Sequence, residues 1–377
     1  MKDLFAEIAE CLKRNERIVL ATIVSSDGSS PLPTGAMMLV KSSAGEIEGS
    51  VGGGLLEALV IEEAKKYFVE RRSPKIGTFD LNDDVSNEGM ICGGSVDVLL
   101  EPITNDDSDC YQDLLNTRKK GSDCVLVRLI GTSGTDVRRF TVQSQHDAVP
   151  ESILSRAGAD TGTVTDAIRH AFGKDDIKRV KGAGCEIIIQ PVRGLQDLVI
   201  VGGGHVSLHL SQIAAIAGFS TTVIDDREEF ANADRFPSAS RVLTAEYDKA
   251  LSRIEVKPST FIVIVTRGHQ FDELVLEHAI RTPARYIGMI GSKRKVIACF
   301  KNLRGRGVAE DSLRRVHAPI GLDIGAITAQ EIAVSIVAEL IRVRRGFEGE
   351  STILSDQLKS WFDGHGESSI PGSRKSK

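Results

Sequence analysis

The fold is decided by the stretch LVIVGGGHVSLHLSQIAAIAGFSTTVIDD, which runs from Leu198 to Asp226. Its first four residues are apolar and three of them are β-branched, as in a strand buried on both faces of a parallel sheet. Three glycines follow, and apolar positions then recur at helical spacing from His205 to Ala217, where Gly218 ends the helix. A second apolar run, Thr221 to Ile224, predicts another strand.

This order of elements is the fingerprint of a dinucleotide-binding Rossmann unit. The glycines Gly202–Gly204 would let the backbone approach a pyrophosphate, and the helix start at His205 would offer free N–H groups and the positive end of the helix dipole. Asp225 stands where an acid would bind a ribose 2′-hydroxyl and repel a 2′-phosphate. Ser207 replaces the third glycine of G-x-G-x-x-G; it is small enough to keep the fold but weakens the inference to NAD, and the fold alone does not fix the ligand.

Composition limits the class of protein. The 377 residues suffice for two domains with their own cores. A net charge of -5 and dispersed basic residues exclude a general nucleic-acid binder, and 5% aromatic residues argue against a single-strand stacking surface. Because no apolar run approaches the roughly 20 residues that span a bilayer and the N-terminus is unlike a signal peptide, we expect a cytoplasmic protein that does not bind membranes. The six scattered cysteines, without a C-x-x-C pair, indicate neither a disulfide framework nor a zinc site.

The chain is expected to form an α/β protein with two domains and a tail. Residues 1–191 predict a mixed α+β domain, residues 197–346 a Rossmann-like parallel sheet with helices on both faces, and residues 347–377 a polar, partly disordered tail. The segment Pro191–Gln196, which contains PVRG, is the predicted hinge.

A second glycine turn lies in the first domain. Gly52, Gly53 and Gly54 run directly into an apolar helix, and such a nest at a helix start can bind an anion. The turn does not match G-x-G-x-x-G, so it predicts a phosphate site rather than a second Rossmann unit. The alternative, that these glycines only allow close packing, stays open.

The run NEGMICGGSVDVLLEP, from Asn87 to Pro102, contains the cysteine most exposed to a ligand. Cys92 precedes Gly93 and Gly94 in a loop, whereas Cys124 and Cys185 lie beside or within apolar strands. We therefore interpret Cys92 as the reactive thiol. A structural role stays open, because no partner thiol or histidine lies nearby in the sequence.

Three later turns carry further candidate ligand residues. The strand Thr260–Val265 ends at Arg267, Gly268 and His269, where ligands bind in open α/β sheets. The next strand ends at GSKRK, residues 291–295, whose basic residues oppose the dipole of the helix that Ser292 would cap; a bound anion would relieve this, although a solvated charge run is the alternative. The last loop, HAPIGLDIGA, contains His317 and Asp323 and leads into a helix with a capping box, Thr328 to Glu331.

The two halves resemble the XdhC/CoxI family, accessory factors that mature molybdenum hydroxylases such as xanthine dehydrogenase. The resemblance rests on these runs: GSSPLPTGAMMLV, GSVGGGLLEA, GMICGGSVDVLLEP, DDREEFANADRFP, VTRGHQFDELVL, RYIGMIGSKRKV and HAPIGLDIGA. It implies a protein that binds molybdenum cofactor, as molybdopterin or its dinucleotide form, promotes exchange of a terminal oxo ligand for sulfur, and delivers the cofactor to its apoenzyme. It also implies a homodimer that contacts a cysteine desulfurase and the target hydroxylase.

The combined hypothesis places the phosphate end of the cofactor on the glycine turns and the basic helix start, and Cys92 near the molybdenum as a soft ligand or sulfur carrier. The expected cofactor-binding residues are Gly52, Gly53, Gly54, Gly93, Gly94, Gly202, Gly203, Gly204, His205, Asp225, Arg267, Gly268, Gly291, Ser292, Lys293 and Asp323. An alternative is an NAD-dependent oxidoreductase, with His269 and His317 as its acid/base candidates. A scaffold without a cofactor is a third possibility, which would leave the glycine turns unexplained.

Overall fold

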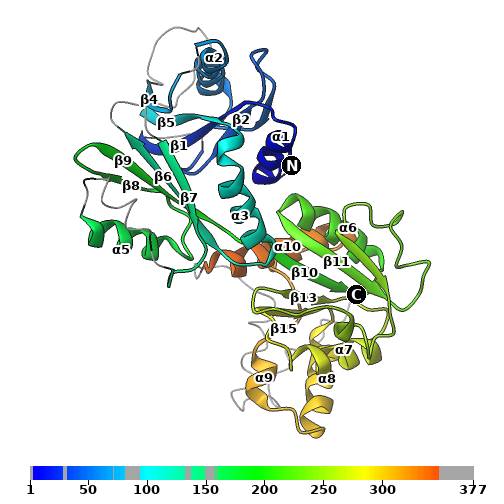
Figure 1. The fold of residues 1–377 in the computed structure, drawn as a ribbon. Helices are drawn as coiled ribbons and strands as arrows, with labels where there is room; N and C mark the ends of the chain where they lie inside the picture. The colour runs from blue at the N-terminus through cyan, green and yellow to red at the C-terminus, as the bar shows by residue number, and fades with distance from the viewer. Residues whose placement is uncertain are drawn as a thin grey trace. The chain divides into compact units, whose positions relative to one another are not determined.

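The structure is a computed structural model that describes residues 3–28, 32–70, 72–80, 94–131, 137–147, 149, 158 and 160–347. The chain divides into two compact units, residues 1–194 and 195–377 (Figure 1). The predicted hinge Pro191–Gln196 is longer than the observed connection, because strand β9 (Cys185–Val192) continues through Pro191 and strand β10 (Gln196–Val201) begins at Gln196. Among the described residues, no helix is both long and apolar enough to span a membrane.

Unit 1 contains two antiparallel sheets. The first has the order β3-β2-β1-β5-β4 and the second the order β7-β6-β9-β8. The other strands are β1 (Ile18–Gly28), β2 (Met37–Val40), β3 (Ile47–Gly49), β4 (Lys75–Asp80), β5 (Gly94–Ile103), β6 (Cys124–Gly131), β7 (Val137–Val142) and β8 (Lys178–Lys181). The helices are α1 (Leu4–Lys13), α2 (Gly54–Glu70), α3 (Ser108–Lys119) and α5 (Thr161–Ala171).

The alternation of apolar residues along these strands sets the layers of unit 1. Val19 and Ala21 pack against α2, whereas Leu20, on the opposite face of β1, packs with Leu126 of the second sheet and with α1 and α3. The far face of the second sheet, with Val125, packs against α5. The two sheets are therefore stacked between α2 and α5, with α1 and α3 contributing to the core between them.

A charged group lies inside this stack of sheets. Glu101 of β5 and Arg128 of β6 are both 0% exposed, with Arg128 Nη1 3.4 Å from Glu101 Oε1. Arg139 of β7 donates from Nε to Glu101 Oε2 at 2.7 Å and from Nη1 to Asp107 at 2.6 Å. The guanidinium nitrogens of Arg128 have no hydrogen-bond partner among the residues that the structure describes. The apolar core is thus interrupted by one ionic layer, which the sequence pattern did not predict.

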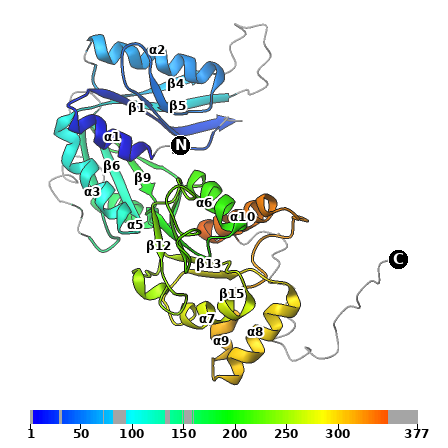
Figure 2. The same ribbon diagram turned by 90° about the vertical axis from the view of Figure 1, so that its right-hand side faces the viewer.

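Unit 2 has a parallel sheet of order β12-β11-β10-β13-β14-β15, with helices on both faces (Figure 2), as predicted. Its other strands are β11 (Phe219–Asp225), β12 (Arg241–Thr244), β13 (Phe261–Ile264), β14 (Tyr286–Met289) and β15 (Val316–His317). Helices α6 (His205–Ile216) and α10 (Ala329–Arg345) cover one face, and α7 (His269–Ala279), α8 (Lys293–Gly305) and α9 (Glu310–Arg314) the other.

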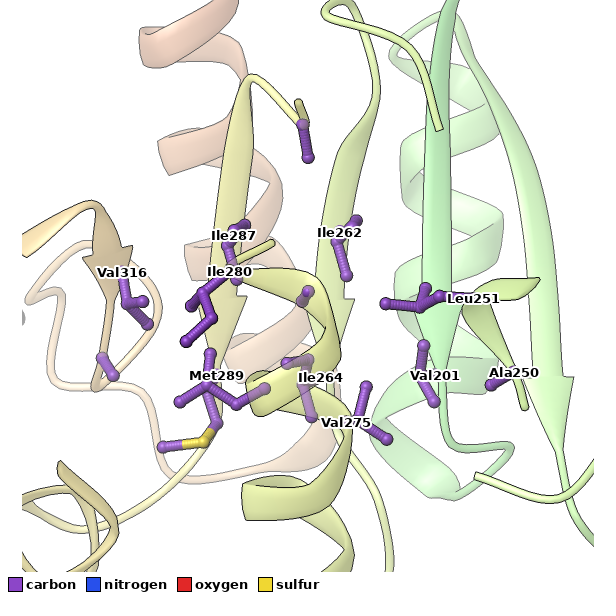
Figure 3. Close-up of a cluster of buried hydrophobic side chains, with 14 of the residues drawn as sticks. Val201, Ala250, Leu251, Ile262, Ile264, Val275, Ile280, Ile287, Met289 and Val316 are labelled. Atoms are coloured by element: carbon purple, nitrogen blue, oxygen red, sulfur yellow. The ribbon is translucent and has the colours of Figure 1, made fainter. Parts of the chain in front are cut away.

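The core of unit 2 follows from its fully buried strands. Figure 3 shows Val201, Ile262 and Ile264 of the sheet in one buried cluster with Val275 of α7. The strand order reverses between β10 and β13, and ligands of open parallel sheets bind outside the carboxyl ends of the strands at such a reversal. The glycine turn Gly202–Gly204 leaves β10 at this point.

Candidate functional site

The three glycines after β10 differ in whether the structure requires a glycine at that position. Gly202 has φ 111°, and a Cβ there would clash with the carbonyl oxygen of Val265. A Cβ on Gly203 would likewise clash with the carbonyl oxygen of Phe230, whereas one on Gly204 would meet no atom within 4 Å. The first two glycines are therefore required by neighbouring backbone, and the third leaves open space before α6. Ser207 is 0% exposed in the first turn of α6.

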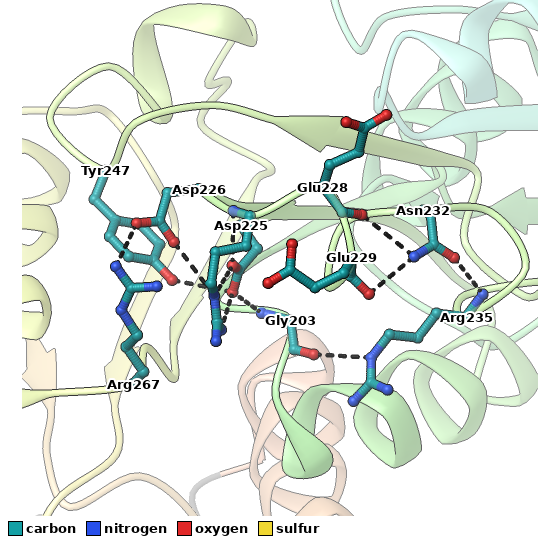
Figure 4. A network of polar contacts seen from close by, with 10 residues as sticks. Gly203, Asp225, Asp226, Glu228, Glu229, Asn232, Arg235, Tyr247 and Arg267 are labelled. Atoms are coloured by element: carbon teal, nitrogen blue, oxygen red, sulfur yellow. Dashed lines mark hydrogen bonds and ion pairs between the residues drawn. The ribbon is translucent and has the colours of Figure 1, made fainter.

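Asp225 is 1% exposed, and its carboxylate is hydrogen-bonded to the backbone of the glycine turn (Figure 4). Its Oδ2 accepts hydrogen bonds from Gly203 N at 2.7 Å and Tyr247 Oη at 3.0 Å. Its Oδ1 accepts from the backbone N and the Nε of Arg227, at 3.1 and 2.9 Å, and Arg227 Nη2 lies 3.2 Å from Oδ2. Burial alone would raise the pKa of Asp225, but the hydrogen bonds from Arg227, Gly203 and Tyr247 outweigh it and lower the pKa.

A carboxylate has about four acceptor positions, so the hydrogen bonds within the chain already fill those of Asp225. A ribose hydroxyl would have to displace one of them. The acid expected to contact a ribose is used here to fix the turn.

Three arginines lie near the glycine turn, two in the loop after β11 and one after β13. Arg235 donates from Nε to the carbonyl oxygen of Gly203 at 3.1 Å, and the guanidinium carbon of Arg227 lies 3.6 Å from the centroid of the Phe230 ring. Arg267, expected to bind the cofactor, donates to Asp226 at 2.7 Å (Figure 4). The sequence interpretation named Arg267 but missed Arg227 and Arg235, although the run DDREEFANADRFP contains both.

Helices α7 and α10 each carry an acid of their own at the start. Asp272, in the first turn of α7, accepts from Thr266 N at 3.1 Å and from Thr266 Oγ1 at 2.7 Å. Thr328 and Glu331 form the predicted capping box of α10, with the Glu331 carboxylate accepting from Thr328 N at 2.9 Å. These carboxylates compensate the positive ends of both helix dipoles.

Helices α6 and α8 differ, because their first turns read HVSL and KRKV and contain no acid. Ser292 caps α8 as predicted, accepting from Lys295 N at 3.4 Å, and Lys293 begins the helix. Both helices follow strands of the parallel sheet and so begin at its carboxyl edge. Their uncompensated N-terminal charge favours a bound anion there.

A cavity of about 240 Å³ lies beside the start of α8. Its walls are mostly apolar, and Gly291 joins it directly to Ser292 and Lys293. The lining residues are Ile290, Gly291, Pro319, Ile320, Leu322, Asp323, Ile324, Gly325, Ala326, Ile332 and Ser335. The expected ligand residues Gly291 and Asp323 thus line one cavity, continuous along the chain with Ser292 and Lys293.

A buried glutamate supports the loop around this cavity. Glu339 of α10 is 0% exposed; its Oε1 lies 2.5 Å from His317 Nδ1 and accepts from Tyr286 Oη at 3.1 Å. Its Oε2 accepts from the backbone N–H of Gly321. Burial and the nearby Glu339 raise the pKa of Tyr286 well above its ordinary value. His317, a candidate acid/base, is therefore anchored to Glu339, which the sequence interpretation missed.

In unit 1 the glycine turn before α2 is closed by the chain itself. Gly52 N donates to Ser50 Oγ at 3.0 Å, and Ser50 Oγ donates to Glu57 Oε2, in the first turn of α2, at 2.6 Å. Gly53 and Gly54 both have positive φ. The first turn of α2 thus carries a carboxylate, Glu57, next to the expected phosphate site.

The remaining candidates lie in several places. Gly94 begins β5, whereas Cys92 and Gly93 lie outside the described residues. His269 follows Gly268 as the first residue of α7.

Cys124 and Cys185 are buried, as expected, and burial raises the pKa of Cys124 to about 12. Within the part of the chain that the structure describes, no cluster of three or more His, Cys, Asp or Glu could hold a metal ion.

Together, the parallel sheet, its glycine turn and its two uncompensated helix starts define a Rossmann-type domain suited to an anionic ligand. Residues 198–340 match the XdhC Rossmann domain and residues 11–80 match the XdhC and CoxI family. The chain belongs to the XdhC and CoxI family.

Three curated relatives extend this similarity. The chain is 27% identical to the uncharacterized protein YqeB of Escherichia coli (strain K12) over 92% of its own length and 47% of the relative's, so it spans about half of that protein. It is 27% identical to a probable xanthine dehydrogenase subunit of Bacillus subtilis (strain 168), over 89% of this chain and 95% of the relative. It is 23% identical to the molybdenum cofactor insertion chaperone PaoD of E. coli (strain K12), over 91% of this chain and 89% of the relative.

One solved structure shares the fold of nearly the whole chain. A crystal structure named as a xanthine dehydrogenase from Bacillus halodurans superposes with a TM-score of 0.71 and 26% sequence identity. The match covers 93% of this chain and 99% of that one.

Proposed function

We propose that this protein is an accessory factor that binds molybdenum cofactor and delivers it to a molybdenum hydroxylase of the xanthine dehydrogenase type. The proposal is supported by the family and by two relatives, one named a molybdenum cofactor insertion chaperone and the other a probable component of xanthine dehydrogenase. The observation that carries it is the pair of helix starts without acids, α6 and α8, at the carboxyl edge of the sheet.

The residues present fit a cofactor that combines a phosphate with a pterin ring. The start of α6, with the open space at Gly204, and the start of α8, with Ser292 and Lys293, would hold phosphate groups through backbone N–H groups. The apolar cavity next to Gly291 offers a surface for a ring. When bound, the cofactor supplies the molybdenum centre that the client enzyme lacks, and the role of this protein is to hold it and release it.

The proposal extends to sulfuration. Cys92 would act as sulfur carrier or soft molybdenum ligand, with a cysteine desulfurase as sulfur source and a homodimer as the working form. Replacing Cys92 with alanine should reduce sulfuration of the cofactor while leaving its binding intact, as measured by reconstitution of an apo-hydroxylase with purified protein. Full sulfuration by the variant would remove Cys92 from the mechanism.

Cofactor binding can be tested directly on the full chain. The protein is expressed in a molybdate-replete host and purified, and the released pterin is oxidised and measured by fluorescence. We expect cofactor in the wild-type protein and about a tenfold loss in Ser292→Ala/Lys293→Ala, because the side-chain hydroxyl and ammonium that would assist the backbone N–H groups at the start of α8 are removed. Lys301→Ala, an exposed position farther along the same helix, is the matched control. Absence of pterin from the wild-type protein would contradict the proposal.

An NAD-dependent oxidoreductase is the alternative. It is less well supported, because the acceptor positions of Asp225 are filled by Gly203, Arg227 and Tyr247. Calorimetric titration with NAD separates the two functions: micromolar binding together with substrate turnover would favour the enzyme, with His269 and His317 as its acid/base candidates.

A further inference from the structure

We propose that the cavity between β14, the loop 319–326 and α10 binds the pterin ring, and that Asp323 recognises the ring through adjacent N–H groups. This inference rests on the proposed function and specifies which part of the ligand this part of the site holds. Its support comes from the rigidity, the size and the polarity of the cavity.

The wall of the cavity is fixed before any ligand arrives. Ile320 N donates to Met289 O at 3.1 Å, which ties the loop to the end of β14. Leu322 N donates to Ser335 O at 3.3 Å, and Ser335 Oγ donates to Leu322 O at 2.6 Å, which ties the loop to α10. Because these bonds already order the loop, binding would cost little conformational entropy.

Gly321 allows the loop to lie this close to the helix. Its φ is 108°, and a Cβ there would clash with Ser335 Oγ. Its N–H donates to the buried carboxylate of Glu339, which also contacts His317 and Tyr286. We assign Glu339 as a positioning residue, because it shapes the cavity without lining it.

The size of the cavity suits one part of a ligand rather than the whole of it. Pockets that enclose a whole drug-sized ligand measure about 300–1,000 Å³, whereas this cavity measures about 240 Å³. Ile290, Ile320 and Ile332 supply apolar contact for the faces of a planar ring. The remainder of the ligand would extend past Gly291 to the start of α8.

Polarity sets the direction in which the ligand lies. Asp323 is the charged residue of the cavity lining, and its two carboxylate oxygens can accept from two parallel N–H donors. The 2-amino group and the neighbouring ring N–H of a pterin form such a donor pair. Lys293 would attract the phosphate, so the two ends of the ligand are distinguished by opposite charges of the protein.

The cavity is tested with free pterin, whose fluorescence anisotropy reports binding to the full chain. Ile332→Trp fills the cavity and should weaken binding at least about tenfold. Val334→Trp is the matched control, because Val334 is exposed two residues away on α10 and should leave binding unchanged. Equal binding by Ile332→Trp, wild type and control would overturn the proposal.

The role of Asp323 is tested with lumazine, in which an oxo group replaces the 2-amino group of pterin. Wild-type protein should bind pterin about tenfold more tightly than lumazine. Asp323→Asn should lose this preference, because asparagine offers one acceptor oxygen to the two N–H donors of pterin where aspartate offers two. Asp323 is exposed, so this variant keeps the fold intact if Ile332→Trp does not. Equal wild-type affinity for both compounds would remove Asp323 from recognition.

These outcomes are independent of the proposed function. Cofactor that purifies with the chain while Ile332→Trp binds pterin normally would sustain the accessory-factor role and overturn the cavity assignment. Pterin binding that depends on Ile332 and Asp323, without any cofactor in the purified protein, would sustain the cavity assignment and contradict cofactor delivery.

Discussion

The two glycine turns of this protein resemble each other in sequence and differ in electrostatics. Before α2, Gly52 is connected through Ser50 to Glu57, so the chain supplies the anion at the helix start. Before α6, the nearby carboxylate of Asp225 lies behind the turn on Gly203 N, and the first helical turn carries no acid. Three glycines therefore do not define an anion site. The position of the chain's own carboxylates decides it.

The largest effect should come from changing the turn before α6. Gly202→Ala combines a positive φ with a backbone clash and should cost at least about 3 kcal/mol of unfolding free energy. Gly204→Ala has open space and should cost about 1 kcal/mol or less. Urea unfolding followed by circular dichroism checks both. Equal costs would show that the two glycines have no separate roles.

Asp225→Asn should destabilise unit 2 by about 2–3 kcal/mol at neutral pH, because a buried charged acceptor of several hydrogen bonds is lost. The pKa of Asp225 is lowered on folding, so its contribution is present above the unfolded value of about 3.9 and disappears as pH falls through the folded pKa. The stability difference between variant and wild type should thus shrink below about pH 4. Urea midpoints from pH 3 to 7 measure it, and a constant difference would contradict the role of the ionised form.

Lys293→Glu would give α8 the kind of acid that α2 already has in Glu57. We expect cofactor retention to fall about tenfold, while the helix gains about 0.3–1 kcal/mol from the dipole interaction. Pterin release and thermal unfolding report the two effects on the same sample. Lys301→Glu makes the same charge change away from the helix start, and an equal loss in that variant would indicate a nonspecific charge effect.

The smallest effect should follow from Glu57→Gln, which removes the acid from the start of α2. Inorganic phosphate should then stabilise the variant by about 0.5 kcal/mol more than it stabilises wild type. The comparison uses melting temperatures with phosphate or chloride at equal ionic strength. If phosphate stabilises both proteins equally, Glu57 does not occupy the anion position.

Features that depend on neighbouring residues could be predicted from the sequence. The strand before Gly202, the Ser292 cap and the Thr328–Glu331 capping box each follow from a few consecutive positions, and the structure contains all three. The predicted hinge, Pro191–Gln196, includes the last two residues of β9 and the first residue of β10. Pro191 pairs with Val125 on one side only, beyond the last residue of β9 that β8 reaches, where a missing N–H is tolerated.

Features that depend on distant contacts could not be predicted. Its spacing from Ile332 and Ile336 places Glu339 on the apolar face of α10, but its partners Tyr286, His317 and Gly321 come from other parts of the chain and meet it only after α10 packs on the sheet. The saturation of Asp225 depends on Tyr247, which lies 22 residues away. Strand β15, Val316–His317, is too short to show a period of two.

The ionic layer between the two sheets of unit 1 has a consequence for how they align. Apolar faces alone would tolerate several offsets of one sheet along the other, since leucine and valine at neighbouring positions are nearly interchangeable. Any offset that moves Arg128 away from Glu101 would leave a guanidinium facing hydrocarbon, at a cost of several kcal/mol. We therefore expect Arg128 and Glu101 to select a single alignment of the sheets. Arg128→Met/Glu101→Met, which leaves Arg139 paired with Asp107, should keep the protein folded while broadening its methyl NMR signals.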